Sequence, residues 1–461
     1  MKKIMVCLLL AAMAMSLCAC GQKEEKKPEI LQIGFSKVDI TPDFEVGLAG
    51  YSDATTRKNT SDPATQIYAT CVAATSGEKT VLIFTVDTIQ MRDSRQQELR
   101  GIISSKTGVP EDCIFMGGTH SHNCPDPYSN QYTKFLLEKM IAAAQEALVD
   151  RSEATILSAT PTIEKMNSVR HFKLQDGTYA GSNFGNMNDP NNPVVAQAAK
   201  VDNQMVLVKF DRGTEKQPVL LVNWQAHPDS AKQIGYNSIS ASWIGPLRDK
   251  LTEDTGMLVA YFTGASGNVN KDSRIAGETK SLAWKAYGEE LARLAEEHLS
   301  ELKPVEGAAI QTARVEETVH IDHTWNSRLP EAMDVWGLWE AGDKTAANKM
   351  AKECGFTSAY QARAIIMRFK MQKTAKLEVG AFSIGGVGFV TGTYEMFASA
   401  SLFIKEQSKF DTTFVITGCY GYIPDAAAFE YRCYEADTGF YQKGTSEQLA
   451  NKMVELLNQF R

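Results

Sequence analysis

Two of the chain's seven histidines, His120 and His122, lie two residues apart in the run Gly118-Thr119-His120-Ser121-His122-Asn123-Cys124-Pro125. An apolar stretch at 113–116 comes just before this run and predicts a buried strand. Imidazoles two residues apart on an extended chain share a face, so one ring could bind a metal and the other a substrate. An isolated pair of this kind more often only satisfies backbone groups in a loop.

Three further predicted strand ends carry side chains that could act together with His120. His227 follows an apolar strand at 219–224, Glu395 follows one at 387–390, and Tyr422 lies in a tyrosine-rich segment after 412–417. α/β proteins bind ligands where such strands end. Two neutral imidazoles, one carboxylate and a further oxygen donor or water form a suitable Zn²⁺ site. Spacing alone does not establish that these residues converge.

Other candidate residues are weaker. The segment His320-Ile321-Asp322-His323 resembles a metal-binding pattern, but positions three apart on an extended strand face opposite sides. His298 lies on the polar side of a predicted helix. Ser266, in the tight loop 264–270, is a poor candidate nucleophile because no matched base is visible.

The pattern of apolar residues predicts an α/β protein with a mixed β-sheet core, flanking helices and catalytic groups at strand ends. Hairpins are predicted at 67–86 and 204–224, and helices at 132–148, 243–255, 279–302 and 446–460. Between 171 and 193 the sequence predicts a long polar loop. Residues 330–372 read as a helical insertion or lid within a single catalytic domain, residues 31–461.

The first residues predict export rather than fold. Two lysines precede an apolar stretch at 4–17 that is too short to remain as a membrane span. The stretch ends in Leu17-Cys18-Ala19-Cys20-Gly21, which resembles the lipobox of bacterial lipoproteins. We therefore expect a signal peptide at 1–19, a lipidated Cys20 that anchors the protein to the bacterial cell membrane, and a polar tether at 20–30. The alternative is an ordinary signal peptide followed by a chance cysteine.

Composition narrows the class of partner. The net charge is −7 at pH 7, and no basic stripe is visible, so we expect no nucleic-acid partner. Apart from Cys20, the expected mature chain has six cysteines at irregular spacings. This pattern permits disulfides but does not predict a pairing.

Taken in order, these segments resemble the catalytic domain of the neutral/alkaline, non-lysosomal ceramidase family. The resemblance runs from Gly34-Phe35-Ser36-Lys37-Val38-Asp39-Ile40-Thr41-Pro42 to the C-terminal helix, and residues 119–125 meet the family's Thr-His-Thr-His-Ser-Gly-Pro motif. It implies Zn²⁺ ligands at His120, His227, Glu395 and Tyr422. It also implies substrate contact by His122 and oxyanion stabilisation by Arg170 and Tyr434. From the residues alone, Tyr422 could be a core tyrosine and Arg170 a member of an ion pair.

The sequence departs from the family in two places. Asn270 stands where the family carries a serine, and the turn at Thr393-Tyr394-Glu395 keeps only the glutamate of the family's Pro-Gly-Glu. Asparagine cannot be acylated as a serine could, so the expected mechanism uses metal-activated water, with Asn270 as a hydrogen-bonding group. The chain also stops soon after the Tyr434 segment, so we expect no C-terminal immunoglobulin-like domain.

Three functional hypotheses follow. The first is a zinc-dependent hydrolase of an amide or ester bond in an N-acyl lipid-like substrate. The second is a surface lipoprotein that binds a ligand without turning it over, for which the missing serine is the argument. The third is a metal-dependent hydrolase of an acylated molecule that is not a lipid.

Overall fold

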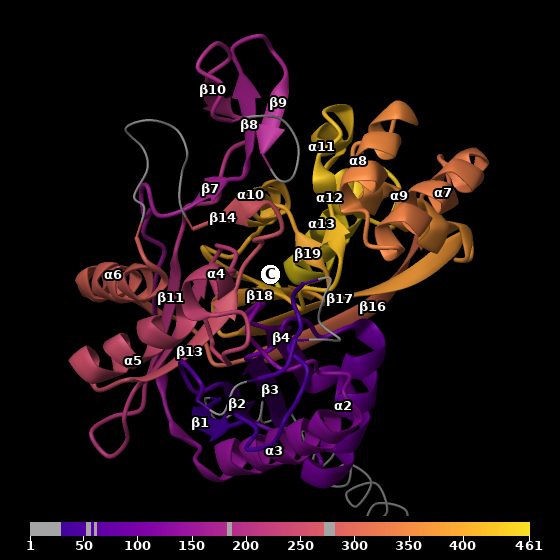
Figure 1. The fold of residues 1–461 in the computed structure, drawn as a ribbon. Coiled ribbons are helices and arrows are strands. Elements are labelled where there is room, and N and C mark those ends of the chain that lie inside the picture. Colours follow the sequence, from indigo (N-terminus) through magenta and orange to yellow (C-terminus); the bar gives the residue numbers. More distant parts are fainter. Residues whose placement is uncertain (1–28, 52–56, 60–61, 182–186, 272–281) are drawn as a thin grey trace, which may run out of the picture.

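The computed structural model describes residues 29–51, 57–59, 62–181, 187–271 and 282–461 (Figure 1). The predicted signal peptide at 1–19, Cys20 and most of the tether at 20–30 lie outside these ranges. None of the described helices is both long and apolar enough to cross a membrane.

The first of three large sheets has the strand order β4-β3-β2-β1-β5. Its strands are β1 (Leu31–Asp39), β2 (Tyr68–Ser76), β3 (Lys79–Val86), β4 (Ile114–Gly118) and β5 (Ser152–Glu153). The predicted hairpin joins β2 to β3 through Gly77, whose φ of 57° is left-handed and favours glycine. Helix α2 (Asp93–Thr107) lies between the parallel strands β3 and β4, and α3 (Asn130–Val149) packs on β1 and β2.

The second sheet has the order β13-β12-β11-β6-β15. Its strands are β6 (Thr155–Ala159), β11 (Val206–Asp211), β12 (Val219–Trp224), β13 (Leu258–Thr263) and β15 (Lys303–Val305). The second predicted hairpin is formed by β11 and β12. Helix α5 (Ile244–Thr255) connects the parallel strands β12 and β13 and packs on α6 (Trp284–Glu297). Of the helix predicted at 279–302, the described part is thus α6 and one 3₁₀ turn at 298–301.

The third sheet has the order β16-β17-β18-β20. Its strands are β16 (Ile310–His320), β17 (Thr374–Ile384), β18 (Val387–Gly392) and β20 (Thr412–Thr417). Helix α10 (Ala398–Gln407) connects the parallel pair β18 and β20, and α13 (Thr445–Asn458) packs on β16, β17 and β18. Each large sheet thus contains one parallel pair, and its strands end where the predicted site residues follow.

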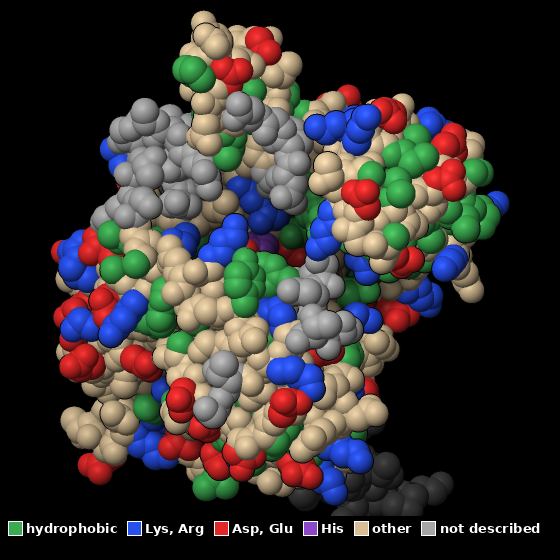
Figure 2. All heavy atoms as spheres, viewed as in Figure 1, with side chains coloured by type: hydrophobic (Ala, Val, Ile, Leu, Met, Phe, Trp, Pro, Cys, Tyr) green, Lys and Arg blue, Asp and Glu red, His purple; other side chains and the backbone are tan. Residues whose placement is uncertain are grey.

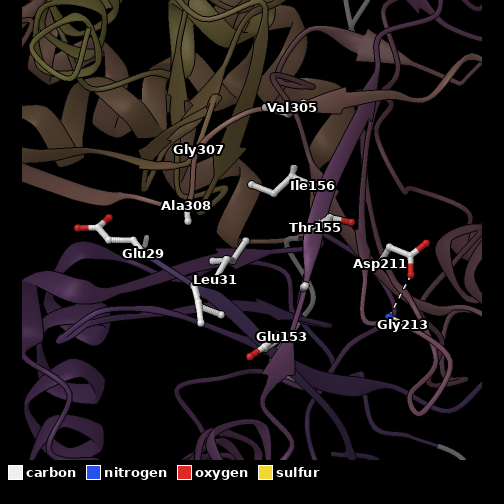
Figure 3. Close-up of a pocket in the computed structure, with 12 residues that line it drawn as sticks. Glu29, Leu31, Glu153, Thr155, Ile156, Asp211, Gly213, Val305, Gly307 and Ala308 are labelled. Atoms are coloured by element: carbon white, nitrogen blue, oxygen red, sulfur yellow. Dashed lines mark hydrogen bonds between the residues drawn. The ribbon is translucent and has the colours of Figure 1, made fainter. Parts of the chain in front are cut away.

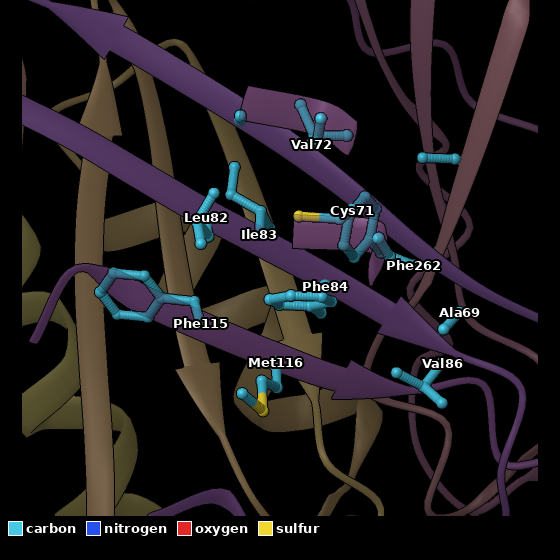
Figure 4. Close-up of a cluster of buried hydrophobic side chains, with 14 of the residues drawn as sticks. Ala69, Cys71, Val72, Leu82, Ile83, Phe84, Val86, Phe115, Met116 and Phe262 are labelled. Carbon is cyan, nitrogen blue, oxygen red and sulfur yellow. The ribbon is translucent and has the colours of Figure 1, made fainter. Parts of the chain in front are cut away.

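One hydrophobic core joins the three sheets. Figure 4 shows its part at β2, β3 and β4, with Phe262 of β13 beside them. A row of rings continues from Phe115 in β4 through Phe382 and Phe389 to Phe414, with centroids 4.4, 4.4 and 5.1 Å apart, and Phe262 lies 6.2 Å from Phe414. All five rings are buried. Close packing of this kind fixes how the ends of the sheets lie relative to one another.

The long polar loop predicted between 171 and 193 is wrong at its start, where residues 171–181 form a hairpin. It contains β8 (His171–Leu174) and β9 (Tyr179–Gly181), which form a small sheet with β10 (Val194–Gln197). Gly177, with φ of 86°, allows the turn between β8 and β9, and the Asp176 carboxylate accepts a hydrogen bond from the Thr178 amide. The strands are only three or four residues long, which hides them from a hydrophobicity pattern.

Three helices follow β16: α7 (Leu329–Glu340), α8 (Lys344–Glu353) and α9 (Ala359–Phe369). They form the lobe at the upper right of Figure 1 and have their own small core, which includes Val335, Phe356 and Ile365. We call residues 329–369 the helical lobe. It lies where the sequence predicted a helical segment, and its role as an insertion or lid stays a prediction.

Candidate active site

The ends of β4, β12 and β18 bring His120, His227 and Glu395 together, although they come from three different sheets. The Nε2 atom of His227 lies 3.1 Å from that of His120 and 3.2 Å from that of His122. The Glu395 Oε2 atom lies 3.2 Å from the His120 Nε2. Three imidazoles and one carboxylate therefore face a common point, and histidine is visible on the floor of a hollow between the lobes in Figure 2.

Backbone carbonyls fix how two of these rings are protonated. The Nδ1–H of His120 donates to the Ile89 carbonyl at 2.6 Å, and that of His227 donates to the Ser266 carbonyl at 3.2 Å. Each neutral ring then carries its lone pair on Nε2, and the two lone pairs point at one another. Such a contact is repulsive unless a cation lies between the nitrogens, and backbone-bonded histidines of this kind are typical metal ligands.

The distances fit a zinc ion. Donors about 2.0–2.1 Å from a tetrahedral zinc lie about 3.3 Å from one another, close to the 3.1 Å between the His120 and His227 Nε2 atoms and the 3.2 Å between the His120 Nε2 and Glu395 Oε2 atoms. The Glu395 side chain is 7 % exposed, and its Oε2 atom has no hydrogen-bond partner among the described residues. A buried carboxylate oxygen without a donor also favours a cation at this point.

The pKa shifts of the three histidines also favour a cation at this point. Burial lowers the pKa of His227 well below its usual value and the pKa of His122 to about 3, so both rings are neutral at pH 7. Burial also disfavours charge on His120, but the Glu395 carboxylate outweighs it and raises the pKa of His120. The cluster thus attracts positive charge at one point, and a single proton cannot serve all three nitrogens.

The backbone at His120 is held in an uncommon conformation. Its φ of 66° lies in the left-handed region, which costs a residue other than glycine about 1 kcal/mol or more. The His120 amide donates to the Thr88 carbonyl at 2.8 Å, which keeps the residue in place as it leaves β4. Strain of this kind is typical of functional residues.

Tyr422 lies opposite Glu395. The short strands β19 (Glu395–Met396) and β21 (Tyr422–Ile423) pair in parallel, with Glu395 and Tyr422 as partners. Burial and the nearby Glu395 carboxylate raise the pKa of Tyr422 well above its usual value, so the phenol is protonated at neutral pH. A cation would have to replace that proton for the oxygen to act as a metal ligand.

Arg170 is held beside this pair. Its Nη2 atom donates to the Gly267 carbonyl at 2.7 Å and lies 2.6 Å from the Glu435 Oε1, and its Cζ atom lies 5.6 Å from the centre of the Tyr422 ring. Tyr434 begins α12 (Tyr434–Thr438), with its ring centre 6.2 Å from that of Tyr422. Burial, followed by Glu435, raises the pKa of Tyr434 to about 12, so its hydroxyl remains a hydrogen-bond donor.

Two residues of this region were missed by the sequence analysis. Glu435 is fully buried and binds both Arg170 and His171, whose Nε2 lies 2.8 Å from the Glu435 Oε2. Burial alone would raise the pKa of Glu435, but Arg170 and His171 hold it well below its usual range. The signal was present in the Tyr434-Glu435-Ala436 segment, because a glutamate among apolar residues requires a buried partner.

Asn270 is linked to this region by backbone pairing. The short strand β14 (Val269–Asn270) pairs with β7 (Ser168–Val169), which places Asn270 opposite Ser168, two residues before Arg170. Ser266 contacts His227 through its carbonyl oxygen. At Gly267 an added Cβ atom would lie 2.8 Å from the carbonyl oxygens of Glu395 and Met396, so the small residues of this loop let two site segments touch.

The weaker candidates stay apart from this site. His298 pairs with Glu301 at the surface, and neither His320 nor His323 belongs to a cluster of metal-ligating side chains in the described ranges. A second such cluster, His171, Cys433 and Glu435, is already satisfied, because Glu435 binds His171 and the Cys433 thiol accepts from the Ala436 amide.

A pocket of about 490 Å³ also lies away from the site (Figure 3). Leu31 at the start of β1 and Ile156 in β6 line it. Strand directions put these residues at the ends of the first two sheets opposite to those that lead to His120 and His227. We assign this pocket no part in the chemistry.

The fold and the site together define a mixed α/β protein with a buried histidine and carboxylate donor cluster at its strand ends. Residues 31–242 match the family described as neutral/alkaline non-lysosomal ceramidase, N-terminal, which confirms the predicted resemblance.

Two solved structures confirm the predicted fold class. The neutral ceramidase from Pseudomonas aeruginosa matches with a TM-score of 0.67 and 14 % identity, and a ceramidase complexed with C2 matches with a TM-score of 0.68 and 13 % identity. Each match covers 94 % of this chain and 75 % of the other. No curated protein matches the sequence.

Proposed function

We propose that this protein hydrolyses the amide bond of an N-acyl lipid-like substrate, as a zinc-dependent member of the ceramidase family. The observation that carries the proposal is the contact between the His120 and His227 Nε2 atoms, each with its Nδ1–H bonded to a carbonyl. Such a contact favours a cation between the nitrogens, and the family match supports the reaction. His120, His227, Glu395 and Tyr422 would hold the ion.

When bound, Zn²⁺ would polarise the acyl carbonyl and lower the pKa of water from ~16 toward ~7. Arg170 and Tyr434 each lie next to the Tyr422 ring and would donate hydrogen bonds to the oxyanion. The loss of one such donor typically reduces the rate on the order of 10²-fold. His122 is neutral and a weak base, which favours a role in orienting the substrate.

The absence of the family's serine supports attack by water rather than by a side chain. Asn270 can donate and accept hydrogen bonds but cannot form an acyl intermediate of the serine kind. Its place in the β7–β14 pairing, three residues from the Gly267 carbonyl that binds Arg170, supports a role in orienting substrate or water.

Metal content measured by elemental analysis tests this proposal. We expect about one zinc per chain in the wild type and in His323→Ala, a matched control at a histidine outside the cluster, and none in His120→Ala or His227→Ala. Ceramide hydrolysis should follow the metal. A wild-type protein that binds no zinc, even when zinc is added, would contradict the proposal and favour a ligand-binding protein without catalysis.

We also propose that a lipid on Cys20 anchors the protein to the outer face of the cell membrane. The lipobox-like segment supports it. Mass spectrometry of the N-terminal peptide should find the lipid, and Cys20→Ser should move the protein from the membrane to the soluble fraction. An unmodified Cys20 in a membrane-free wild type would contradict this.

A further inference from the structure

The short helix α12 contacts both the candidate active site and the helical lobe. It packs on β21 at the site and on α9 of the lobe. The ring centre of Tyr434, its first residue, lies 6.2 Å from that of Tyr422. The same ring packs edge-on against Tyr360 of α9, at 6.0 Å and an interplanar angle of 88°. Tyr434 therefore contacts one ring of the site and one ring of the lobe.

The two site residues of α12 differ in what fixes them. The Glu435 carboxylate is bound by Arg170 at 2.6 Å and by His171 at 2.8 Å, and all three belong to the body of the protein. In the described part of the chain, no such bond fixes the Tyr434 hydroxyl. The position of that hydroxyl therefore depends on the rings that pack on it and on where α12 lies.

Asp437 is the residue through which the lobe holds α12. Its side chain is 8 % exposed, and its carboxylate accepts a hydrogen bond from the Thr357 hydroxyl at 2.6 Å. Its carbonyl accepts from Arg368 at 3.0 Å, and its amide donates to the Cys433 carbonyl within the helix. Because Asp437 and Tyr434 lie three apart on one short helix, a shift of the first displaces the second.

A contact with the lobe also stabilises the turn that leads into α12. Arg432 has a φ of 51°, in the left-handed region that is uncommon for residues other than glycine. Its guanidinium donates to the Gln361 side-chain oxygen at 3.1 Å and lies 3.5 Å from the Asp437 carboxylate. Gln361 is fully buried in α9. Such a backbone conformation persists where the surroundings hold it in place.

We propose that the helical lobe positions Tyr434 for the reaction, with Thr357 and Tyr360 as positioning residues. Thr357 acts through Asp437, and Tyr360 acts on the Tyr434 ring. The inference rests on the proposed function, in which the Tyr434 hydroxyl stabilises the oxyanion. A donor of this kind is effective only when it is held in place before the reaction, so a loosened α12 reduces kcat and leaves substrate binding unchanged.

Thr357→Val tests the proposal, because it keeps the size of the side chain and removes the hydroxyl that binds Asp437. We expect kcat for ceramide to fall about 3- to 10-fold, with KM and zinc content unchanged. Thr357→Ser keeps the hydroxyl and should retain the wild-type kcat. A wild-type kcat in Thr357→Val would overturn the proposal.

Asp343→Ala is the matched control within the lobe. The Asp343 carboxylate accepts from the Ala346 amide at 2.9 Å at the start of α8, so the change also removes one hydrogen bond from the lobe, but not one to α12. Its kcat should stay at the wild-type level, even where its Tm falls as far as that of Thr357→Val. Equal losses of kcat in the two variants would show a general effect of lobe stability and contradict a positioning role.

A double-mutant cycle shows whether Thr357 acts through Tyr434. Tyr434→Phe removes the hydroxyl, so nothing remains for the lobe to position. Adding Thr357→Val to Tyr434→Phe should then lower kcat by less than about twofold. A further loss as large as that in the wild-type background would overturn the proposal.

Hydrogen exchange separates this inference from the proposed function, because it needs no activity. The amides of α12 should exchange faster in Thr357→Val than in the wild type, while those of β4, which leads to His120, should not change. Faster exchange in a protein that hydrolyses no ceramide would support the coupling of the lobe to α12 and contradict the proposed function. Ceramide hydrolysis with unchanged exchange would support the proposed function and overturn this inference.

Discussion

Two buried charged clusters in this protein differ in how their atoms are satisfied. At Glu378, in β17, Arg100 donates to both carboxylate oxygens at 2.8 and 2.6 Å, and Arg314 binds the same carboxylate and the Ile114 carbonyl. At Glu395 the side chain is equally buried, at 7 % exposure, yet its Oε2 lacks a hydrogen bond within the described chain and faces imidazole nitrogens that also lack donors.

The Glu378 cluster is structural and the Glu395 cluster is a candidate binding site, although the two carboxylates are equally buried. Burial of a carboxylate requires compensating charge and hydrogen bonds. Around Glu378 two guanidinium groups supply both from within the chain, so the cluster is complete. Around Glu395 the nearest partner is an imidazole nitrogen and no guanidinium donates to Oε2 within the described chain, which favours compensation by a bound cation. Incomplete satisfaction, more than burial, marks the functional site.

Glu378→Gln should have the largest effect on stability. The change leaves two buried arginines without their carboxylate, and loss of one partner from a buried pair typically costs about 3–5 kcal/mol. Urea unfolding measures this loss. Zinc content should stay at the wild-type level. A Glu378→Gln protein that lost the metal without losing stability would show that Glu378, and not only Glu395, belongs to the metal site.

His227→Ala should abolish stabilisation by zinc. The wild type should gain about 2.7 kcal/mol at free zinc a hundredfold above the dissociation constant. The variant should gain nothing, because the ring that contacts both other imidazoles is removed. Thermal unfolding with and without zinc tests this, with His323→Ala as a control that keeps the full shift. A zinc shift of equal size in His227→Ala would show that the ion binds elsewhere.

Glu435→Gln should reduce the rate of hydrolysis by about 10-fold, less than the ~10²-fold expected for Arg170→Ala, because it acts only through the position of Arg170. The Glu435 carboxylate holds the guanidinium and His171 but does not face the histidine cluster. The effect should fall on kcat, with zinc content unchanged. A change in KM alone would contradict a positioning role.

The pH dependence of stability should give the smallest effect. The pKa of Glu435 lies below its usual range because Arg170 and His171 outweigh burial, so its stabilising contribution is complete above about pH 4.3. As the pH falls below this value, the free energy of unfolding of the wild type should decrease by up to about 1.4 kcal/mol per pH unit because Glu435 takes up a proton on unfolding. Glu435→Gln should lack that part of the slope in urea titrations at acidic pH. Parallel slopes for the two proteins would contradict the assignment.

Local features of the chain were accessible from the sequence. The hairpins around Gly77 and Gly213, the helix α3 and the strand ends before His120 and His227 follow from hydrophobic periodicity and turn residues, which act over a few residues. The short strands β8 to β10 were missed for the same reason, because three or four residues are too few to show a period.

Convergence of the site was not accessible from the sequence by pattern alone. His120, His227 and Glu395 lie on three sheets, and their distances depend on how those sheets pack through rings such as Phe382 and Phe414. The family resemblance supplied the grouping that periodicity could not. An ion pair of Arg170 was left open from the sequence, but neither argument named Glu435 as the partner of Arg170 and His171, because that pairing depends on side-chain directions across segments far apart in the chain.

The distribution of the site over three sheets has a consequence for the order of folding. Because no single sheet carries more than part of the donor set, the complete set exists only after all three sheets have docked on their shared core. Contacts between such distant segments form late in slow-folding proteins. Zinc uptake by a refolding chain should therefore report the last step of assembly, after most secondary structure has formed.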